Sequence, residues 1–464
     1  MVEFYTDNNK KNIKIISLTP ARLITWLKKQ TKPVQRWVKS TEFMAKPGQI
    51  CLIADANGEL SQVLFGIKNE DDFWSVGALP RLLPKNSYEL DNSESFFNSE
   101  QYHRAQLAWG LGIYQFNAYV QRDSFSDRFL YVKKSLCSAL QDLVSSIYLI
   151  RDLINTPAAD MGPEQLAKAA KTVAFEHKAK ISMITGDALQ KQNFPAIYAV
   201  GKGAAQEPRL IDITWGDPKA PKVTLVGKGV CFDTGGLDLK PAINMREMKK
   251  DMAGAAHVLG LARLIMLAQL PLRLRVLIPA VENSIDANSY RPGDIIKTRG
   301  GLSVEIDNTD AEGRLILCDA LTEAVSEEPS YLFDFATLTG AASVALGPEM
   351  PAMYCNEEQF ASEMLQVSQR VKDPMWRMPL HKPYRDFLKS DIADLLNSSK
   401  VPVAGSITAA LYLQTFIPDE VRWMHFDFYA ANMESKPGRP LGGEAMVIRA
   451  VFEFLRSKFG NCGG

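Results

Sequence analysis

The sequence lacks the features that mark several specialised classes of protein. It has no internal repeat, no low-complexity tract and no heptad run, so repeat arrays and coiled coils are excluded. A membrane-spanning helix needs about 20 apolar residues, and no stretch of 19 or more residues is free of charged side chains. The N-terminus, MVEFYTDNNKKN, lacks the apolar segment of a signal peptide. We therefore expect neither secretion nor a membrane span, and we predict a cytoplasmic protein.

The sequence also lacks an excess of either charge, since Lys+Arg and Asp+Glu both number 53. Without a net charge the chain has no general attraction for nucleic acids or anionic membranes, although a local basic patch is not excluded. The six cysteines are spread over the whole length and none stands in a CxxC pair, which is typical of reduced thiols. Nucleic acid and membrane are therefore not expected partners, and neither a disulfide framework nor a zinc knuckle is predicted.

What the chain does have is length. Its 464 residues, 46% hydrophobic and 23% charged, exceed one ordinary domain and can bury a large core. The chain changes character at NTPAADMGP, residues 155–163, where prolines and a glycine follow an apolar helical stretch from Leu136 to Ile154. We predict an N-terminal α/β domain over residues 1–156, with a scaffold or oligomer-contact role, and a catalytic domain over residues 157–464.

The second region alternates apolar strands with helical segments. This order is typical of an α/β fold in which a largely parallel, mixed sheet is sandwiched by helices. The candidate strands are Val223–Val226, Arg275–Ile278, Leu302–Ile306 and Tyr331–Phe335. Polar motifs follow these strands, and open α/β sheets bind their ligands at the carboxyl ends of the strands. We therefore expect the functional site at that edge of the sheet.

The first of these strands runs into VGKGVCFDTGGLDLKP, residues 226–241. This segment carries Lys228, Asp233 and Lys240 among four glycines, which permit tight turns and close approach of the backbone to a ligand. A phosphate-binding loop is the main alternative, but it requires GxxxxGK[ST] or GxGxxG. Neither pattern is present in this segment.

The residues that follow, from about Asn244 to Met266, have apolar side chains at helical spacing and predict one helix packed on the sheet. In that helix Asp251 lies at the flank of the apolar stripe and needs a cationic partner, which could also be a neighbouring surface lysine. His257 lies on the opposite side of the helix and is not expected to bind a metal. No histidine stands in an HxxxH or HxH pair, so a zinc-protease helix is absent.

The octet NTDAEGRL carries two acids and an arginine close together, Asp310, Glu312 and Arg314. With Asp233 and Asp251 it would gather four acids at one edge of the sheet, where they cannot all stay ionised without cations. Two divalent ions would balance four carboxylates, as in two-metal hydrolytic sites. Oxygen ligands favour manganese or zinc and are also compatible with magnesium or cobalt. The alternative is an exposed turn in which these charges are solvated.

Taken together, these motifs resemble the leucyl aminopeptidase family of cytosolic two-metal aminopeptidases, over roughly residues 150–430. The family signature NTDAEGRL is unbroken, and the companion patterns around Lys228 and Asp251, ATLTGA and GSITAAL also match. The resemblance implies a metal-dependent aminopeptidase that releases N-terminal amino acids from peptides with a free N-terminus. Water activated between two metal ions would attack the first peptide bond. The resemblance also implies a homo-oligomer, a hexamer.

The resemblance further implies a role for each motif residue. The tighter metal would be held by Lys228 as a neutral amine and by Asp233, Asp251 and Glu312. The more exchangeable metal would be held by Asp233, Asp310 and Glu312. Lys240 would stabilise the oxyanion, and Arg314 would hold a bicarbonate that serves as general base. The implied substrate-binding residues are Met248, Thr337, Leu338 and Gly340.

Other interpretations stay open without the resemblance. Lys228 could be only an ion-pair partner of the acids, and Arg314 could pair with a carboxylate. The site could belong to another two-metal hydrolase such as a phosphoesterase, and a nucleic-acid-binding regulator is an alternative as a second activity. The chain also reads HFDFYAANM where the family commonly reads HLDIAG, so Tyr429 stands where a small residue usually borders the side-chain pocket. A preference for leucine is therefore not expected.

Overall fold

The computed structural model describes residues 3–8, 12–93, 97–121 and 124–460. The chain forms two compact units, Met1–Tyr148 with Glu434–Leu441, and Leu149–Met433 with Gly442–Gly464. The division falls within the long helix α5 (Lys134–Asn155), whereas the sequence placed a domain boundary just after that helix. The return of residues 434–441 to the first unit has no signal in the sequence.

The first unit is built on a six-stranded sheet with the strand order β1-β6-β5-β2-β4-β3, in which only β3 is antiparallel to its neighbour. Helices accompany the sheet, and α4 begins with a capping box between Asn98 and Gln101. The strands are β1 (Tyr5–Thr6), β2 (Ile13–Leu18), β3 (Ile50–Ala54), β4 (Leu60–Gly66), β5 (Asn86–Asp91) and β6 (Arg128–Tyr131). The helices are α1 (Pro20–Lys28), α2 (Lys32–Ser40), α3 (Leu79–Leu82) and α4 (Ser99–Ile113).

The second unit contains a larger mixed sheet with the order β16-β15-β18-β14-β9-β11-β8-β7, and β10 also pairs with β11. Its central strands, β18, β14, β9 and β11, are parallel. Strand β8 runs antiparallel to both β11 and β7, and β15 runs antiparallel to β18 but parallel to β16. The strands are β7 (Lys180–Thr185), β8 (Arg209–Trp215), β9 (Lys222–Gly227), β10 (Gly229–Asp233), β11 (Arg273–Asn283), β14 (Tyr331–Ala336), β15 (Ala352–Cys355), β16 (Trp376–Arg377) and β18 (Trp423–Asp427). The predicted fold class is confirmed.

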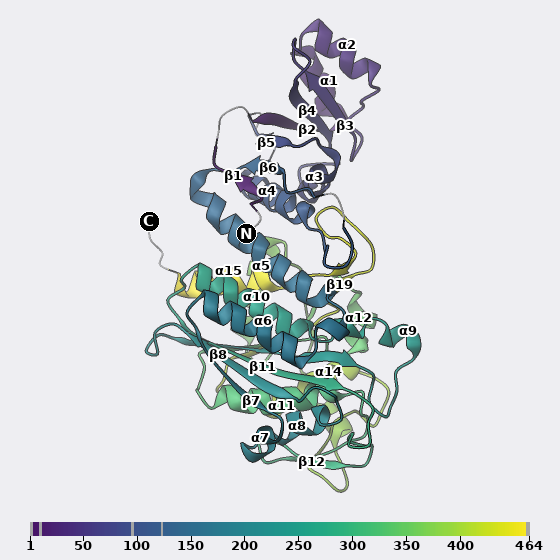
Figure 1. Ribbon diagram of the computed structural model, residues 1–464, viewed down its shortest axis with the longest axis vertical. Coiled ribbons are helices and arrows are strands. Elements are labelled where there is room, and N and C mark those ends of the chain that lie inside the picture. The colour runs from purple at the N-terminus through teal and green to yellow at the C-terminus, as the bar shows by residue number, and fades with distance from the viewer. Residues whose placement is uncertain (1–2, 9–11, 94–96, 122–123, 461–464) are drawn as a thin grey trace. The chain divides into compact units, whose positions relative to one another are not determined.

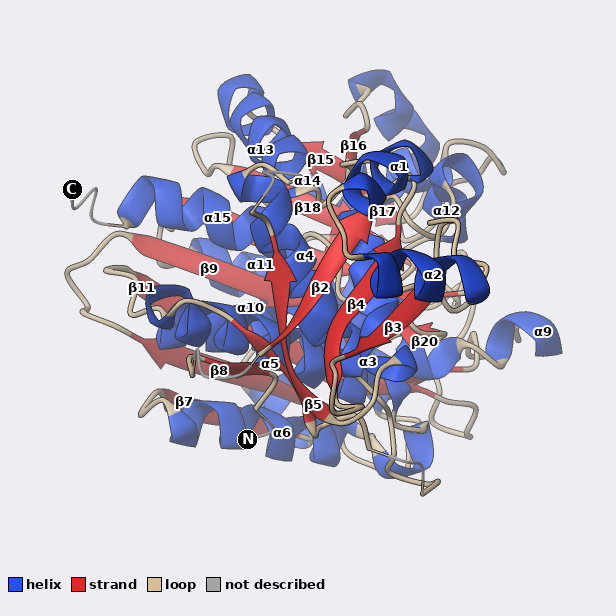
Figure 2. Ribbon diagram, turned by 90° about the horizontal axis from the view of Figure 1, so that it is seen from above, coloured by secondary structure: helices blue, strands red, loops and turns tan. Residues whose placement is uncertain are grey.

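Helices cover both faces of this sheet (Figures 1 and 2). One face carries α6 (Pro163–Glu176), α10 (Ala253–Leu267), α13 (Glu358–Val371) and α15 (Ile448–Phe459). The other carries α8 (Pro195–Gly201), α11 (Glu312–Val325) and α14 (Gly405–Gln414). Apart from His257 and Arg263, helix α10 has apolar or small side chains on all sides, because it is buried between the sheet and its neighbouring helices. In the described part of the chain, no helix combines the length and apolar character needed to span a bilayer.

The predicted continuous helix over residues 244–266 is wrong. The chain forms a short α9 (Ala242–Met245), a 3-10 turn η3 (Met248–Lys250) and then α10. The start of α10 lies against the backbone of the sheet, so close that a Cβ on Gly254 would come 2.0 Å from the carbonyl oxygen of Phe335. The spacing of apolar residues in the sequence does not reveal such a close approach between two segments of backbone. Asp251 therefore lies in the link between η3 and α10 rather than on the flank of a helix.

Two further expectations about strands need correction. The predicted strand at residues 302–306 exists as β13 (Ser303–Glu305), but it belongs to a separate three-stranded sheet with β12 (Ile295–Lys297) and β17 (Leu395–Leu396). Strand β10 was not predicted, because its glycine and aspartate resemble loop residues. It adds to the edge of β11 beyond the end of β9 and thereby carries Asp233 toward the site.

Candidate active site

Lys228 lies in the single-residue link between β9 and β10 and is 3% exposed. Its backbone is fixed on both sides: its N–H donates to the carbonyl of Phe335 (3.0 Å), and its carbonyl accepts from the N–H of Ala255 (2.8 Å). Its side chain runs past Gly313, where a Cβ would come 2.6 Å from Lys228 Cε. The absence of a side chain at Gly313 thus leaves the space that this lysine occupies.

The structure brings all four predicted acids together around two lysines. Lys228 Nζ lies 2.8 Å from carboxylate oxygens of both Asp251 and Glu312. Lys240 Nζ lies 2.8 Å from Asp233 and also contacts Asp310. The alternative of a solvated turn is wrong for this octet, since Glu312 is 1% exposed and Asp310 is half-buried.

A pair of positive-φ glycines shapes the loop between Asp233 and Lys240. Gly235 and Gly236 have φ values of 90° and 66°, which favour glycine. The loop then turns back, so that the Lys240 N–H donates to the carbonyl of Thr234 (3.0 Å). This turn brings the ammonium of Lys240 to the carboxylate of Asp233.

The cluster carries more negative than positive charge. Four carboxylates face two ammonium groups, and burial is the largest cause that raises the pKa of Glu312 well above its ordinary value, followed by the nearby Asp233. Burial and Asp233 likewise raise the pKa of Asp310 to about 6. Although burial opposes it, the surrounding acids raise the pKa of Lys228. Additional positive charge at the cluster would therefore be electrostatically favourable.

The donor set of this cluster fits metal ions. Asp233, Asp310 and Glu312 each offer an oxygen, and these oxygens lie within 4.8 Å of one another. Oxygen Oε2 of Glu312 is buried and accepts no hydrogen bond from the described residues. A buried carboxylate oxygen without a partner is costly, and a hard divalent ion would satisfy it. Asp251 and Lys228 extend the set on the side of Glu312.

The segment after β14 borders the cluster. Thr337 Oγ1 donates to Asp251 (2.7 Å), and the carbonyl of Thr337 accepts from Lys228 Nζ (3.1 Å). Leu338 follows, and Gly340 begins helix α12 (Gly340–Leu346). Met248 opens η3 three residues before Asp251 and is only half-buried, so it is not part of an apolar stripe on a continuous helix.

Arg314 is the third residue of α11 and is 7% exposed. Within the described ranges, no acid forms an ion pair with it, and its Nε and Nη1 atoms donate no hydrogen bond. Burial lowers the pKa of Arg314, since charging an unpaired buried guanidinium is unfavourable. The alternative in which a carboxylate pairs with Arg314 therefore has no support in the described residues, and its unused donors match a planar anion.

Two family profiles match the chain. The profile described as "Cytosol aminopeptidase family, catalytic domain" matches residues 148–452, and the one described as "M17 aminopeptidase, N-terminal domain" matches residues 13–130. The chain belongs to the cytosol aminopeptidase family. The resemblance that the sequence motifs indicated is thereby confirmed.

Other members of the cytosol aminopeptidase family agree with this assignment. A probable cytosol aminopeptidase of Syntrophotalea carbinolica is 42% identical over 67% of this chain and 63% of its own length. One from Chlamydia abortus is 44% identical over 64% of this chain and 60% of its own length. In both cases the chain spans less than two thirds of the length of the curated relative it matches.

Solved structures cover nearly the whole chain. The crystal structure of cytosol aminopeptidase from Coxiella burnetii has a TM-score of 0.95 and 51% identity, and covers 98% of this chain and 99% of its own. The bottromycin maturation enzyme BotP in complex with Mn has a TM-score of 0.86 and 29% identity, over 97% of this chain and 99% of its own. Both structures therefore share the arrangement of this aminopeptidase fold.

Two side chains that support the cluster were not predicted from the sequence, namely Asn283 and Tyr290. Asn283, the last residue of β11, donates to Asp233 (2.8 Å) and to the carbonyl of Thr309 (3.1 Å). Tyr290 also donates to the carbonyl of Thr309 (2.5 Å). The strand predicted here ends at Ile278, five residues before Asn283, and the partners of Asn283 lie far away along the chain, so no local pattern indicated this residue.

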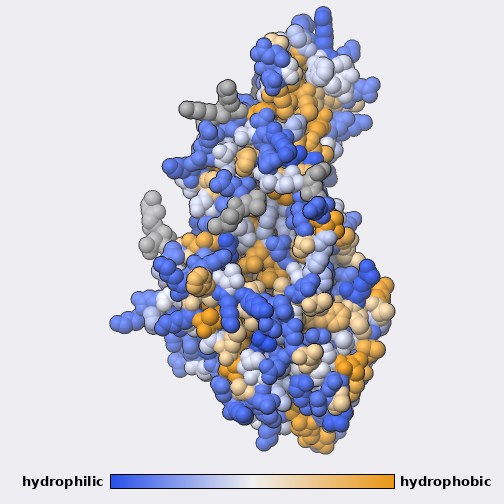
Figure 3. Space-filling model, in the orientation of Figure 1, coloured by the Kyte–Doolittle hydropathy of each residue, from blue (hydrophilic) through white to orange (hydrophobic). Residues whose placement is uncertain are grey.

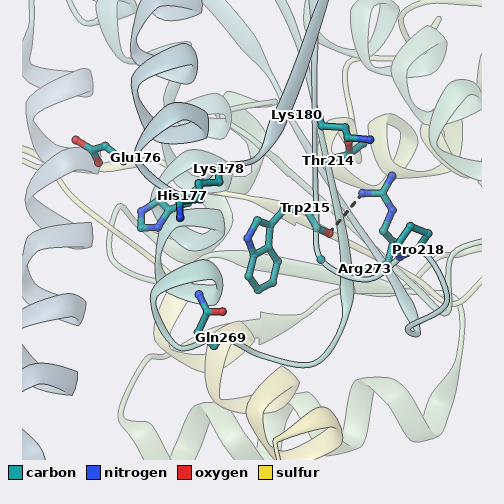
Figure 4. Close-up of a pocket in the computed structure, with 10 residues that line it drawn as sticks. Glu176, His177, Lys178, Lys180, Thr214, Trp215, Pro218, Gln269 and Arg273 are labelled. Atoms are coloured by element: carbon teal, nitrogen blue, oxygen red, sulfur yellow. Dashed lines mark hydrogen bonds between the residues drawn. The ribbon is translucent and has the colours of Figure 1, made fainter.

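Two other features of this aminopeptidase fold, a buried histidine and a cavity, lie outside the acid cluster. His257 is fully buried, its Nδ1 lies 2.7 Å from the carbonyl of Ala253, and its Nε2 accepts from the N–H of Met446. Figure 4 shows a separate cavity of about 510 Å³ around Trp215 and Arg273, which contains none of the predicted site residues. Arg273 begins β11, so this cavity lies at the ends of the strands away from Lys228.

Proposed function

We propose that this chain is a metal-dependent aminopeptidase that releases N-terminal amino acids from peptides. The observation that carries the proposal is the buried cluster of four acids with only two compensating lysines, in a chain of the cytosol aminopeptidase family. Two divalent ions, when bound, would supply Lewis acidity and an activated water. Membership of the family favours this function over a phosphoesterase or a nucleic-acid-binding regulator.

The metal ligands would be the clustered residues themselves: Lys228, Asp233, Asp251, Asp310 and Glu312. Asp233 and Glu312 would serve both ions, as the family resemblance implies. In support, Glu312 contacts Lys228 and Asp233 contacts Lys240, while oxygens of the two carboxylates lie within 4.8 Å of each other. Lys228 would bind through its neutral amine, which requires loss of the proton that the acids now favour. Manganese or zinc suits these ligands best, and the manganese complex of BotP supports the former.

Two cationic side chains would act on the substrate. Lys240, whose side chain is 13% exposed, is the more accessible ammonium of the cluster and would stabilise negative charge on the oxygen of the scissile carbonyl. Arg314, with donors unused by the described residues, would hold bicarbonate in a position to accept a proton from the attacking water.

The substrate would lie between Asp251 and the segment from Thr337 to Gly340. Its free amine is a cation and would meet the carboxylate of Asp251, which limits cleavage to the N-terminal residue. Met248 would line the side-chain pocket, and Tyr429 would narrow it. Lys250 holds Tyr429 in place, with its Nζ 3.0 Å from the carbonyl oxygen and 3.1 Å from the ring centroid. Because Tyr429 would narrow this pocket, the enzyme should prefer substrates with a small N-terminal side chain over those with N-terminal leucine.

The proposal includes a cytoplasmic homo-oligomer, a hexamer by family resemblance. Exposed apolar side chains support association, including Ile243 (80% exposed) and Val344 (90%) in the second unit. Figure 3 shows hydrophobic side chains gathered in patches on a face that is otherwise largely hydrophilic.

The direct test is a comparison of substrates on the metal-loaded protein. We expect hydrolysis of alanyl and leucyl arylamides after loading with manganese or zinc, faster for alanyl, and no hydrolysis of N-acetylated alanyl arylamide or of nitrophenyl phosphate. Turnover of nitrophenyl phosphate without arylamide turnover would replace the proposal with a phosphoesterase.

A further inference from the structure

Asp427, the last residue of β18, is 1% exposed, and all of its hydrogen bonds come from neutral donors. Its Oδ1 accepts from the backbone N–H groups of Leu338 (2.9 Å) and Thr339 (3.1 Å). Its Oδ2 accepts from the hydroxyls of Thr339 (2.6 Å) and Ser406 (3.1 Å). Among the described residues no cation forms an ion pair with this carboxylate.

A buried carboxylate that forms no ion pair is costly, so its use needs a structural reason. Four donors converge on this point, and a carboxylate can accept four hydrogen bonds, whereas the oxygen of an asparagine accepts about two. The amide nitrogen of asparagine would also face the hydroxyls of Thr339 and Ser406, which are donors here. An ionised carboxylate at position 427 therefore matches the four donors better than an asparagine amide would.

The contacts of Asp427 all lead to the segment that borders the acid cluster. Strand β18 is parallel to β14 and places Asp427 level with Ala336, directly before Thr337. Thr337 in turn bonds to Asp251 and Lys228, so the segment is held from one side by the cluster and from the other by Asp427. Ser406 is itself fixed by the hydroxyl of Tyr354 (2.8 Å).

We propose that Asp427 is a positioning residue that sets the backbone of residues 337–340 for substrate binding. The proposal rests on the function proposed above for that segment. Because the N–H groups of Leu338 and Thr339 point at Asp427, they are not available to a carbonyl of the substrate. At these two residues the segment can offer only carbonyl oxygens, which match the N–H groups of a peptide main chain.

The first test measures hydrogen exchange of the amides of Leu338 and Thr339 in the full-length, metal-loaded protein, and it does not require activity. In Asp427→Asn these amides should exchange at least roughly tenfold faster than in the wild type, because their acceptor is weakened. Asp373→Asn is the matched control: Asp373 is also buried and accepts from backbone N–H groups, those of Val447, Arg449 and Ala450. Unchanged exchange of Leu338 and Thr339 in Asp427→Asn overturns the proposal.

The second test separates positioning from a loss of folded enzyme. For a dipeptide substrate, Asp427→Asn should raise KM roughly tenfold with two metal ions still bound, whereas Asp373→Asn should leave KM unchanged. A lower kcat with unchanged KM, equal in both variants, would mean a merely structural role and would overturn the proposal. If the wild type hydrolyses no peptide, the proposed function fails, while hydrogen exchange still decides whether Asp427 holds the segment.

A milder variant guards against misfolding of Asp427→Asn. Thr339→Val keeps the carboxylate and both backbone hydrogen bonds. It removes the hydroxyl that donates to Asp427 and that also caps α12 by accepting from the N–H of Ala342. It should raise KM by a smaller factor, about threefold, again with metal content unchanged. An unchanged KM in this folded variant would count against the proposal.

Discussion

At the scale of single residues, the balance of charge decides the behaviour of the site. Two buried lysines offset two of the four acids, and burial together with the nearby Asp233 raises the pKa of both Asp310 and Glu312. Removing one acid should therefore have two effects. It should reduce the repulsion among the carboxylates in the metal-free protein, and it should remove a ligand of the proposed metal ions.

Glu312→Ala tests this directly. We expect the variant to lose tightly bound metal and activity, because Glu312 would serve both ions, while the thermal midpoint of the metal-free protein does not fall. The control is Asp319→Asn, a buried carboxylate on the same helix that caps α8 through the N–H groups of Ala196 and Ile197 and should keep two ions. Metal analysis after dialysis gives the answer, and two ions retained in Glu312→Ala would argue against the ligand set.

Lys240→Ala separates oxyanion stabilisation from metal binding. We expect kcat to fall by roughly 10²- to 10³-fold, as for other oxyanion donors, while two ions stay bound. Lys389→Ala, a change in an exposed lysine of the same unit, is the control and should leave kcat unaltered. Steady-state kinetics with metal analysis distinguishes the two effects, and unaltered turnover in Lys240→Ala would remove this lysine from the mechanism.

His257 makes stability depend on pH in the acid range. Burial lowers the pKa of His257 to about 4, although Ala253, Asp373 and Glu444 favour its charged form. The folded state thus prefers neutral histidine, so its contribution is complete above the unfolded value near 6.5 and is lost as pH falls toward 4. The slope is up to about 1.4 kcal/mol per pH unit in that window.

The variant His257→Gln isolates this contribution. Its free energy of unfolding should be lower at pH 7 but should fall less steeply than that of the wild type between pH 6.5 and 4.5. Urea titrations at several pH values measure the difference. Parallel curves for the two proteins would show that His257 does not titrate on unfolding.

Sequence motifs predicted the residues of the cluster but not those that hold them. Lys228, Asp233, Asp310 and Glu312 stand in short segments whose glycines and charges are informative by themselves. Asp427 and Asn283 act through partners that lie far away in sequence and become neighbours only when parallel strands pair. No local pattern carries that information.

At the scale of elements, close backbone approach overrides periodicity. The apolar spacing of residues 244–266 predicts one helix, yet the chain breaks before α10. The start of α10 lies against β9 and β14, with Gly254 beside the backbone of Lys228 and Phe335. The break places Asp251 where it meets Lys228.

Gly254→Ala tests this explanation. Its Cβ would lie 2.0 Å from the carbonyl oxygen of Phe335 and 2.6 Å from the N–H nitrogen of Lys228, and neither backbone can yield easily. We expect a loss of about 3 kcal/mol or more in the free energy of unfolding. Gly340→Ala is the control, because nothing lies within 4 Å of its Cβ position, and should change stability little. Denaturant unfolding of both variants measures these changes. Equal losses of unfolding free energy in Gly254→Ala and Gly340→Ala would contradict the explanation.

At the scale of the whole molecule, composition excluded more than it identified. The balance of 53 basic and 53 acidic residues argued against a general polyanion partner, and the length argued for two domains. Strands β9, β11 and β14 were predicted because they are apolar runs, whereas β10 was not, since its residues have mixed polarity. Strand β13 was predicted as a strand, but its place in a separate small sheet with β12 and β17 was not. The placement of residues 434–441 in the first unit depends on tertiary contacts alone.

The central claim is that the acid cluster holds two divalent ions. The most direct measurement is anomalous diffraction from crystals grown with manganese. We expect two anomalous peaks per chain, one within bonding distance of oxygens from Asp233, Asp251 and Glu312, and the other within bonding distance of oxygens from Asp233, Asp310 and Glu312. Full-occupancy peaks elsewhere on the chain, with none at these four carboxylates, would contradict the account.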